Sequence, residues 1–218
     1  MSAIVKKRPS ILITAGPTRE KIDPVRFISN YSTGIFGYEL AGEAVRRGAR
    51  VTLVSGPTHL KAPQGVKLIG VESALEMRNA ALSELKGADY VIMAAAVSDW
   101  RPKKASSRKI KRSLGKITLE LVENPDILSE ICAHKAGRVV AGFALETENL
   151  EKNALKKLLG KNADIIVANS LNRRSRVFGD NRSDIVIIDK LGNKIRVRNR
   201  YKRELSHIIL DKILSFNI

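Results

Sequence analysis

Short apolar runs alternate with amphipathic stretches along most of the chain. Apolar residues at every second position, or in an unbroken run, predict strands, whereas apolar residues three and four positions apart predict helices. The strand pattern occurs at 11–14, 51–54, 66–71, 90–96, 117–122, 139–144, 164–168, 184–188 and 194–198. The helix pattern occurs at 36–47, 73–85, 149–159 and 205–216, and Pro125 is placed to begin another helix at its first turn.

The order of these elements predicts an α/β fold. Strands that alternate with helices form a doubly wound, mostly parallel Rossmann-like sheet with helices on both faces. The strands at 184–188 and 194–198 follow one another without a helix, so they predict a C-terminal strand pair. Residues 1–10 are polar and basic and are expected to form a disordered lead-in, and 11–218 are expected to form a single domain.

The connection between the first strand and the first helix is unusually long. Such connections usually contain a few residues, whereas this one runs from Gly16 to Gly37 and is rich in Thr, Ser, Asn and Arg. Glycines at both ends let a ligand approach the backbone, and the N-terminus of the helix that follows attracts phosphate. This long polar loop is therefore predicted to form the active site.

The composition narrows the classes of protein. The formal net charge is +17 and the sequence pI is about 10.2, which favours nucleotides, phosphorylated metabolites or nucleic acid as partners. Aromatic residues make up 5% of the chain, too few for a stacking surface for single-stranded bases. The sequence has no apolar run of about 18 residues and no secretory signal pattern, so a cytoplasmic protein without a membrane span is expected.

Thiol and metal chemistry find little support in the sequence. Cys132 is the single cysteine, and it lies in an apolar helical pattern typical of a small buried residue rather than a nucleophile. The three histidines are scattered, so no ligand spacing for a protein-bound metal is present.

The sequence also lacks two familiar nucleotide fingerprints. A dinucleotide site needs Gly-x-Gly-x-x-Gly in a tight turn and an acidic residue after the second strand, and a P-loop needs Gly-x4-Gly-Lys-Ser/Thr. Here Gly34 and Gly37 are a lone pair, and the second strand ends in Val-Ser-Gly-Pro at 54–57. A nucleotide- or NAD-dependent enzyme on a Rossmann-like fold and a basic nucleic-acid-binding α/β domain remain as alternatives, although no recognisable nucleic-acid-binding motif occurs.

Six blocks of sequence occur in the same order as in a known family. They are Gly-Pro-Thr-Arg-Glu at 16–20 with Ile-Asp-Pro-Val-Arg-Phe-Ile-Ser-Asn at 22–30, Ala-Ala-Ala-Val-Ser-Asp-Trp-Arg-Pro at 94–102, Lys-Ile-Lys-Arg at 109–112, Asn-Pro-Asp-Ile at 124–127, Gly-Phe at 142–143, and Asp-Ile-Ile-Val-Ala-Asn at 164–169. On these blocks the chain resembles phosphopantothenoylcysteine synthetase, the synthetase half of the bacterial bifunctional coenzyme A biosynthesis protein.

The resemblance implies a ligase of the CTP-using type. Such an enzyme joins 4′-phosphopantothenate to L-cysteine through an acyl-cytidylate, releases pyrophosphate and CMP, and uses Mg²⁺ with the triphosphate. A homodimer is also implied, with the strands at 184–188 and 194–198 as candidate interface. The decarboxylase half is expected to be absent, so the chain would be a stand-alone synthetase or an excised domain. Ile35 stands where many bacterial members carry lysine.

The resemblance further implies roles for individual residues. Asn30 would hold the acyl-cytidylate, and Lys109 would lie on a flap that closes over the intermediate and contacts the nucleotide. The other residues implied in nucleotide binding are Met93, Ala94, Ala95, Asp99, Asn124, Pro125, Asp126, Ile127, Phe143, Lys157 and Lys161. The substrate and phosphate loop would comprise Gly16, Thr18, Arg19 and Arg26. No side-chain cluster suggests a metal site, and Mg²⁺ would lie near Asp99 with the triphosphate.

The residue types themselves leave alternatives at several of these positions. An amide such as Asn30 can donate to an oxygen on which charge develops, or it can satisfy its own loop. Asp99 could accept from ribose or cytosine or could cap a turn. Arg26 could contact phosphate or brace the loop, and Phe143 could pack on a base or belong to the core.

Two sets of charged residues, the pair Lys157 and Lys161 and the basic segment 101–116, also have two interpretations each. Lys157 and Lys161 lie four positions apart on a predicted helix, where like charges repel. They would either bind a triphosphate or be solvated. The basic segment 101–116 has no apolar stripe and is expected to be mobile without ligand, either as a lid or as a solvated run of charges.

Overall fold

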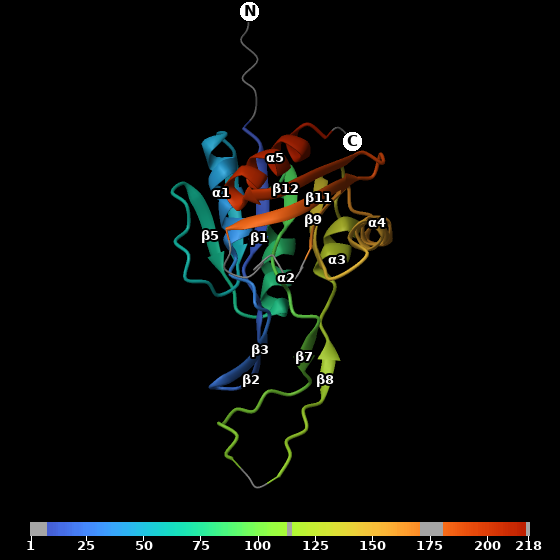
Figure 1. The fold of residues 1–218 in the computed structure, drawn as a ribbon. Helices are drawn as coiled ribbons and strands as arrows, with labels where there is room; N and C mark the ends of the chain where they lie inside the picture. Colours follow the sequence, from blue (N-terminus) through green and yellow to red (C-terminus); the bar gives the residue numbers. More distant parts are fainter. Residues whose placement is uncertain (1–7, 113–114, 171–180, 217–218) are drawn as a thin grey trace, which may run out of the picture.

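A mostly parallel sheet forms the centre of the fold (Figure 1). The computed structural model describes residues 8–112, 115–170 and 181–216, and within them this sheet has eight strands. The strands are β1 (Ser10–Ala15), β4 (Arg50–Ser55), β5 (Val66–Gly70), β6 (Tyr90–Met93), β9 (Val139–Glu146), β10 (Ile165–Ser170), β11 (Arg182–Asp189) and β12 (Lys194–Tyr201). The helices are α1 (Ile35–Arg46), α2 (Ala74–Leu85), α3 (Ile127–Ala133), α4 (Leu150–Lys161) and α5 (Lys202–Leu214).

The strand order of the sheet is β12-β11-β10-β9-β6-β1-β4-β5. The strands from β10 to β5 in this order are parallel, and β11 and β12 are added antiparallel beyond β10. The chain runs outward from β1 to β5 and then returns to β6, so its direction of winding reverses between β1 and β6. In doubly wound sheets, ligands bind beyond the carboxyl ends of the strands at this switch point.

Helices cover both faces of the sheet, which explains the unbroken apolar runs of the central strands. All six residues of β1 are buried. Ile11 and Ile13 belong to the core beneath α1 and α5, whereas Leu12 belongs to the core beneath α2, α3 and α4. The predicted doubly wound fold with a C-terminal strand pair is confirmed.

Some predicted bounds were wrong. β6 ends at Met93 rather than at 96, because the residues that follow bond to the end of β1 and the loop after it. The strand predicted at 117–122 is confined to β8 (Leu121–Glu123). Ser10, assigned to the lead-in, is buried and begins β1. Residues 1–7 and most of the basic loop at 172–181 lie outside the described residues.

The start of α3 also differs from the prediction. Pro125 precedes the helix instead of occupying its first turn. The Asp126 side chain accepts a hydrogen bond from the Ser129 N–H at 3.0 Å and caps the helix. A carboxylate cap satisfies an N–H that the helix itself cannot pair, so the helix begins at Ile127.

A slender arm projects from the carboxyl edge of the sheet (Figure 1). The arm comprises residues 19–29, 100–112 and 115–123. It contains a hairpin of β2 (Arg19–Asp23) and β3 (Arg26–Ser29), and an antiparallel pair of β7 (Trp100–Pro102) with β8. The hairpin was not predicted, because its strands are short and mix apolar with charged residues.

Polar contacts join the basic segment of the arm to the hairpin. The Ser106 N–H donates to the Ile22 carbonyl at 2.9 Å, and the Ile110 N–H donates to Asp23 Oδ2 at 3.1 Å. The Arg26 guanidinium donates to the Ile110 carbonyl at 2.7 Å and forms an ion pair with Asp23. The described part of the basic segment therefore has specific anchors that its composition did not indicate.

Candidate functional site

The loops that leave β1 and β6 are bonded to each other at the switch point. The Ala94 and Ala95 N–H groups donate to the carbonyl and hydroxyl oxygens of Thr14, at 3.2 and 3.3 Å. The Gly16 carbonyl accepts from the Ala96 N–H at 2.9 Å. The N–H groups of Ala94 and Ala95 therefore hold the loop after β6 against the end of β1.

Thr18 completes this junction. Its N–H donates to the Ala96 carbonyl at 3.2 Å, and its buried hydroxyl accepts from the Ser98 N–H at 3.0 Å. Gly16 has a φ of +74°, a conformation that favours glycine. Thr18 and Gly16, assigned to the phosphate loop, therefore have structural roles here that account for their residue types.

Two adjoining cavities open at this edge of the sheet. The α3 cavity, of about 500 Å³, is bounded by residues 123–128, and the α1 cavity, of about 590 Å³, is bounded by residues 29–36. The residues that line both cavities, and so form a shared wall, are Ala95, Val97, Asp99, Phe143 and Lys157. Two different molecules could therefore occupy the cavities and meet at this wall.

The α3 cavity brings together the block at 124–127 with Met93 and Lys161. Lys161 forms an ion pair with Asp126, the residue that caps α3. Burial raises the pKa of Asp126, but the Lys161 ammonium and the Ser129 N–H outweigh it and hold that pKa below its ordinary value. Asp126 is thus ionised, and its negative charge offsets the positive charge of Lys161.

Asn124 connects this cavity to the exit of β6. Its side-chain amide donates to the Ser98 carbonyl at 2.8 Å, and its N–H donates to the Asp99 carbonyl at 2.8 Å. The Arg101 guanidinium donates to its side-chain oxygen at 3.1 Å. The Asn124 side chain therefore positions the wall of the cavity.

Lys157 provides a cation at the shared wall. Its ammonium donates to the Phe143 carbonyl at 2.9 Å. Burial lowers the pKa of Lys157, although the nearby carboxylates of Glu146 and Asp126 act to raise it. A partly desolvated ammonium gains more from an incoming anion than a solvated one. Lys157 and Lys161 have separate protein partners, so neither is simply a solvated surface lysine.

The α1 cavity contains Asn30, whose amide donates to the Ala96 carbonyl at 3.0 Å. An asparagine amide carries two N–H groups, so one hydrogen bond orients the group and leaves a donor for a ligand. Phe143 meets Phe36 edge to face, with ring centroids 5.4 Å apart. Phe143 thus packs on a neighbouring ring and also faces both cavities.

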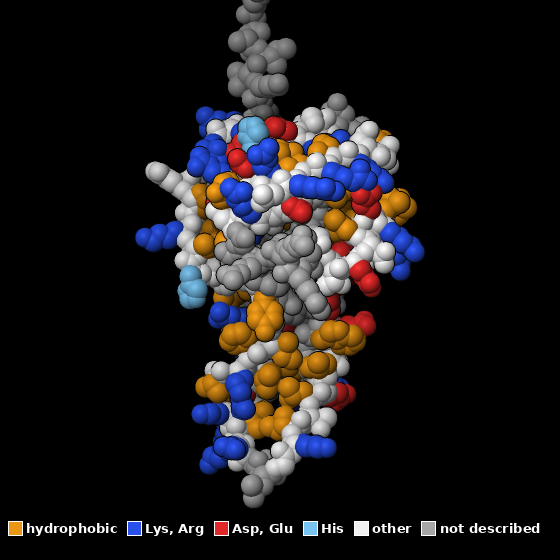
Figure 2. Space-filling model, viewed as in Figure 1, with side chains coloured by type: hydrophobic (Ala, Val, Ile, Leu, Met, Phe, Trp, Pro, Cys, Tyr) orange, Lys and Arg blue, Asp and Glu red, His pale blue; other side chains and the backbone are white. Residues whose placement is uncertain are grey.

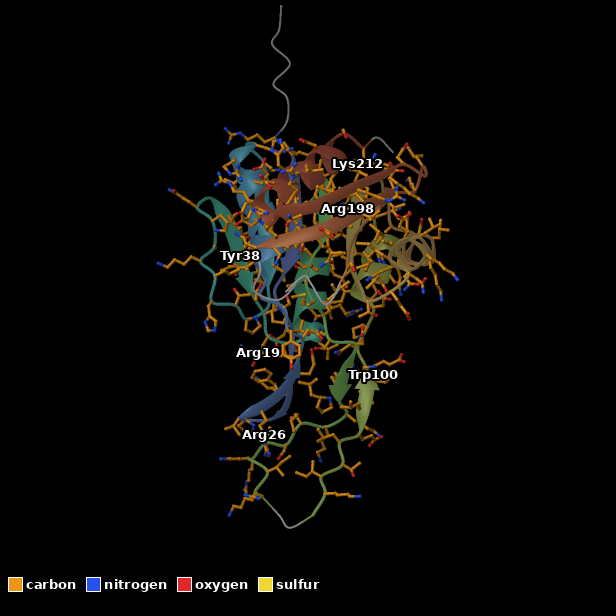
Figure 3. All side chains as sticks on the ribbon, viewed as in Figure 1. Arg19, Arg26, Tyr38, Trp100, Arg198 and Lys212 are labelled. Carbon is orange, nitrogen blue, oxygen red and sulfur yellow. The ribbon has the colours of Figure 1, made fainter. Side chains whose placement is uncertain are left out.

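Five predicted site residues line neither cavity: Gly16 and Thr18, which belong to the junction described above, and Lys109, Arg19 and Arg26. Arg26 braces the arm through Asp23, and its guanidinium holds the pKa of Asp23 well below the usual range. The Arg19 guanidinium lies 4.5 Å from the centroid of the Phe27 ring. Figure 3 shows Arg19 and Arg26 along the arm, with Trp100 across from them. Lys109 is exposed on the same arm.

Lys202 lines the α1 cavity and was missed. It is buried, and its ammonium lies 5.8 Å from the centroid of the Phe36 ring. The helix was predicted to begin at 205, so nothing in the sequence separated this lysine from the many other basic residues. Asn169, which ends one of the six blocks, lines the same cavity and was also not assigned a role.

The described residues contain no group of three or more His, Cys, Asp or Glu side chains that could hold a metal ion. Asp99 is the carboxylate on the shared wall. Burial raises the pKa of Cys132 to about 11, which keeps the thiol protonated, as its apolar surroundings predicted. Within the described part of the chain, no helix is long and apolar enough to cross a membrane.

The fold and the adjoining cavities define a Rossmann-like domain with a polar binding site at its switch point. The chain belongs to the family described as DNA/pantothenate metabolism flavoprotein C-terminal domain, whose profile matches residues 6–216. The family resemblance inferred from the six sequence blocks is confirmed.

Two similar curated proteins are each named coenzyme A biosynthesis bifunctional protein CoaBC. The one from Bacillus subtilis (strain 168) is 45% identical over 208 residues, covering 95% of this chain and 51% of the relative. The one from Escherichia coli (strain K12) is 40% identical over 213 residues, covering 96% and 52%. The chain therefore spans about half the length of these relatives.

A solved structure is similar over almost the whole chain. The crystal structure of the C-terminal domain of coenzyme A biosynthesis bifunctional protein CoaBC has a TM-score of 0.80 and 42% sequence identity. The match covers 94% of this chain and 93% of that chain.

Proposed function

We propose that this chain is a phosphopantothenate–cysteine ligase that uses CTP and acts in coenzyme A biosynthesis. The observation that carries the proposal is the pair of cavities that share a wall of Asp99, Phe143 and Lys157. A ligase of this kind must hold a nucleotide and an acid so that the carboxylate reaches the α-phosphorus. Family membership and the names of the relatives support the same reaction.

In the proposed first step, CTP occupies the α3 cavity and phosphopantothenate occupies the α1 cavity. The carboxylate oxygen attacks the α-phosphorus, the bond from this phosphorus to the bridging oxygen breaks, and pyrophosphate leaves. Lys157 at the shared wall would stabilise the negative charge that builds up there. Mg²⁺ would enter with the triphosphate and neutralise part of its charge, and Asp99 is the carboxylate on the shared wall.

In the second step, the cysteine amine attacks the carbonyl carbon of the acyl-cytidylate. A C–N bond forms, the C–O bond to phosphate breaks, CMP leaves, and the amine loses a proton. Asn30 would donate its remaining N–H to the carbonyl oxygen, where charge develops. Lys109 would act from the arm, which requires the basic segment to close toward the cavities. A ligase that consumes CTP would work in the cytoplasm.

The reaction has a direct test. Purified protein should release pyrophosphate from CTP only when 4′-phosphopantothenate is present, and CMP release should further require cysteine. Thermal shift with CTP and Mg²⁺, NAD or a DNA duplex tests the alternatives, since a ligand that binds the folded state raises its stability. Stabilisation by NAD or DNA alone, or no nucleotide turnover with phosphopantothenate, would contradict the proposal. Replacing CTP by ATP measures the nucleotide preference.

We further propose that the protein is a homodimer that associates through the arm. Large apolar side chains of the arm are exposed, including Phe27, Trp100 and Ile117 at 46%, 48% and 56%. Figure 2 shows hydrophobic side chains gathered along this arm. Two-stranded ribbons are marginally stable alone, so a second copy that covers this surface would stabilise both. The interface suggested by the sequence is less suitable, because β11 is mostly buried and β12 is an edge strand with exposed basic residues.

Light scattering tests the dimer. Ile117→Asp should shift the protein from dimer to monomer, because an unpaired carboxylate would be buried in the interface. Leu159→Asp is the matched control, since Leu159 is 67% exposed on α4, outside the arm. A monomeric unaltered protein, or dissociation by the control alone, would contradict the arm interface.

A further inference from the structure

Arg101 joins the arm to the α3 cavity without lining either cavity. It lies on β7, and Figure 1 shows β7 and β8 where the arm meets the sheet. The Arg101 guanidinium donates to the Glu123 carbonyl and, at 3.1 Å, to the side-chain oxygen of Asn124. Asn124 lines the α3 cavity and not the α1 cavity. Arg101 is therefore one residue removed from the cavity proposed for the nucleotide.

The contact with Arg101 decides which way the Asn124 amide faces. The amide nitrogen donates to the Ser98 carbonyl at 2.8 Å, and the amide oxygen accepts from the guanidinium. If the amide were turned around, its oxygen would face the Ser98 carbonyl and its nitrogen would face the guanidinium, so both contacts would be repulsive. Because an arginine side chain can only donate, Arg101 holds the amide in the orientation that forms a hydrogen bond on each side.

Asn124 in turn connects two segments that line the α3 cavity. Its N–H donates to the Asp99 carbonyl at 2.8 Å, so its backbone and its side chain bond to neighbouring residues after β6. Ser98, Asp99, Asn124, Pro125 and Asp126 all line this cavity. Loss of the amide orientation would therefore loosen the contact between the residues after β6 and the start of α3.

We propose that Arg101 is a positioning residue for nucleotide binding, which acts through Asn124 and couples the arm to the α3 cavity. The inference rests on the proposed function, in which CTP occupies this cavity. Because Arg101 belongs to the arm and Asn124 to the cavity, order in β7 and β8 favours the arrangement of residues 124–127 that binds CTP. Coupling between two equilibria is reciprocal, so bound CTP favours order in β7 and β8 to the same extent.

The first test measures CTP binding with Mg²⁺ by calorimetry. Arg101→Met, which keeps the apolar stem, should weaken CTP binding roughly tenfold, the loss of about one hydrogen bond. The KM for 4′-phosphopantothenate at saturating CTP should stay unchanged, since Asn124 does not line the α1 cavity. Arg101→Lys should recover part of the affinity, because an ammonium lacks the planar fork of donors. Lys103→Met is the matched control, since Lys103 lies on the same arm and pairs with Glu120.

A double-mutant cycle separates action through Asn124 from direct attraction between the guanidinium and the triphosphate. In an Asn124→Ala background, adding Arg101→Met should cost no further CTP affinity. A further tenfold loss in that background, a raised KM for phosphopantothenate, or an equal loss in Lys103→Met would overturn the inference while the proposed function stands. If Arg101→Met did not fold, Arg101→Gln would replace it.

Hydrogen exchange tests the coupling between arm and cavity. CTP should slow exchange in β7 and β8 of the unaltered protein, and much less in Arg101→Met; equal slowing in both would contradict the coupling. Without ligand, the Asn124 N–H should exchange faster in Arg101→Met than in the unaltered protein, and an unchanged rate would overturn the positioning role. If the unaltered protein bound no CTP, the proposed function would fail, and this ligand-free comparison would still decide whether Arg101 holds Asn124.

Discussion

The sheet of this protein buries apolar side chains on both faces, whereas its arm exposes them. In the sheet, alternate residues of β1 enter two different cores, so each strand is held from both sides. In the arm, Phe27, Trp100 and Ile117 are exposed, and polar contacts around Asp23 join the segments. Burial of apolar area stabilises the sheet without a ligand, whereas the arm depends on a few anchors and on whatever covers its apolar surface.

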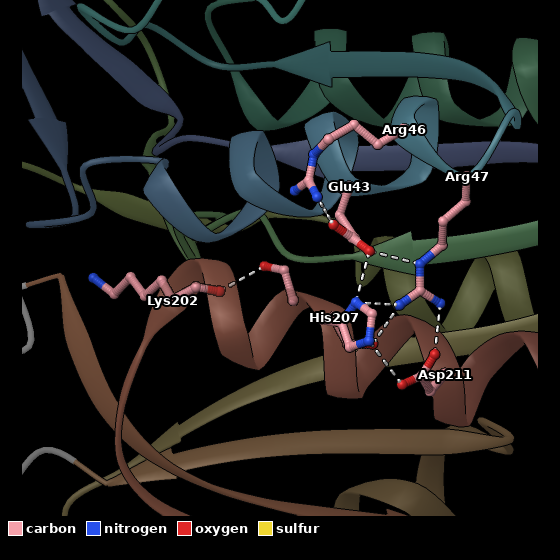
Figure 4. Close-up of polar contacts among 7 residues, drawn as sticks. Glu43, Arg46, Arg47, Lys202, His207 and Asp211 are labelled. Atoms are coloured by element: carbon pink, nitrogen blue, oxygen red, sulfur yellow. Dashed lines mark hydrogen bonds and ion pairs between the residues drawn. The ribbon is translucent and has the colours of Figure 1, made fainter.

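The sheet region also contains an ionic cluster around the buried Glu43, between α1 and α5 (Figure 4). Glu43 is 3% exposed and accepts hydrogen bonds from Arg47 Nε at 2.7 Å and His207 Nδ1 at 2.9 Å. The Arg47 guanidinium also forms an ion pair with Asp211, with 2.8 Å between Nη1 and Oδ1. The first residues of both helices line the α1 cavity, and the cluster joins the two helices further along their length.

The largest effect is expected where the arm joins the sheet, at Asn30. Asn30→Asp should leave folding nearly unchanged, because the side chain packs little, but should slow the second half-reaction by about 10²–10³-fold through loss of a donor to the developing charge. Acyl-cytidylate should then accumulate in rapid-quench experiments. Near-normal turnover would remove Asn30 from the mechanism and leave it with the structural bond to Ala96.

The next largest effect, a loss of kcat, is expected on replacing Lys109 of the arm. Lys109→Gln should lower kcat by roughly ten- to a hundredfold if the ammonium contacts the intermediate, with little change in melting temperature. Lys103→Gln is the control, since Lys103 pairs with Glu120 at 2.6 Å on the same arm. Hydrogen exchange over the basic segment should slow when CTP and phosphopantothenate are added. Equal activity of the two variants, or equal protection in both states, would mean that the arm does not act as a lid.

A smaller effect, on stability rather than rate, is expected in the sheet region. Glu43→Gln should cost about 1.5–3 kcal/mol of unfolding free energy, as for loss of a charged hydrogen bond. Burial raises the pKa of Glu43, but Arg47, His207 and Arg46 outweigh it and lower that pKa below 4.5. The stabilisation is therefore complete above pH 4.5 and is lost as the pH falls through the lowered value. Denaturant melts at several pH values check this, with Glu39→Gln on the same helix as control.

The smallest effect on global stability is expected from Asp23→Asn in the arm. The variant should speed hydrogen exchange at Ile110 and in the β2–β3 hairpin while the melting temperature of the sheet stays nearly constant. The Arg26 side chain holds the pKa of Asp23 well below the usual 3.8, so this anchor is present above that value and is lost only in stronger acid. A cooperative loss of the whole fold would show that arm and sheet are not separately stabilised.

The sequence by itself determined the sheet and much of the site's location. The nearly continuous apolar run at 90–96 predicted a central strand, because a parallel strand covered on both faces is apolar along its whole length. The length and polarity of the loop after β1 predicted the edge at which the cavities open. Asn30 and Asp99 were identified through ordered blocks that belong to the family, whereas Lys157 was a candidate because it lies four positions from Lys161 on a predicted helix.

The tertiary structure alone decided which polar groups meet. The Arg26 guanidinium pairs with Asp23 and donates to the carbonyl of Ile110, which lies in a distant segment of the chain. The sequence around Arg26 therefore could not show whether this residue contacts phosphate or braces the loop. Lys202 reads as one more surface lysine until α5 packs on α1 and buries it beside Phe36. Periodicity records which face of an element is buried, whereas the partner of a charge depends on which distant segments fold beside it.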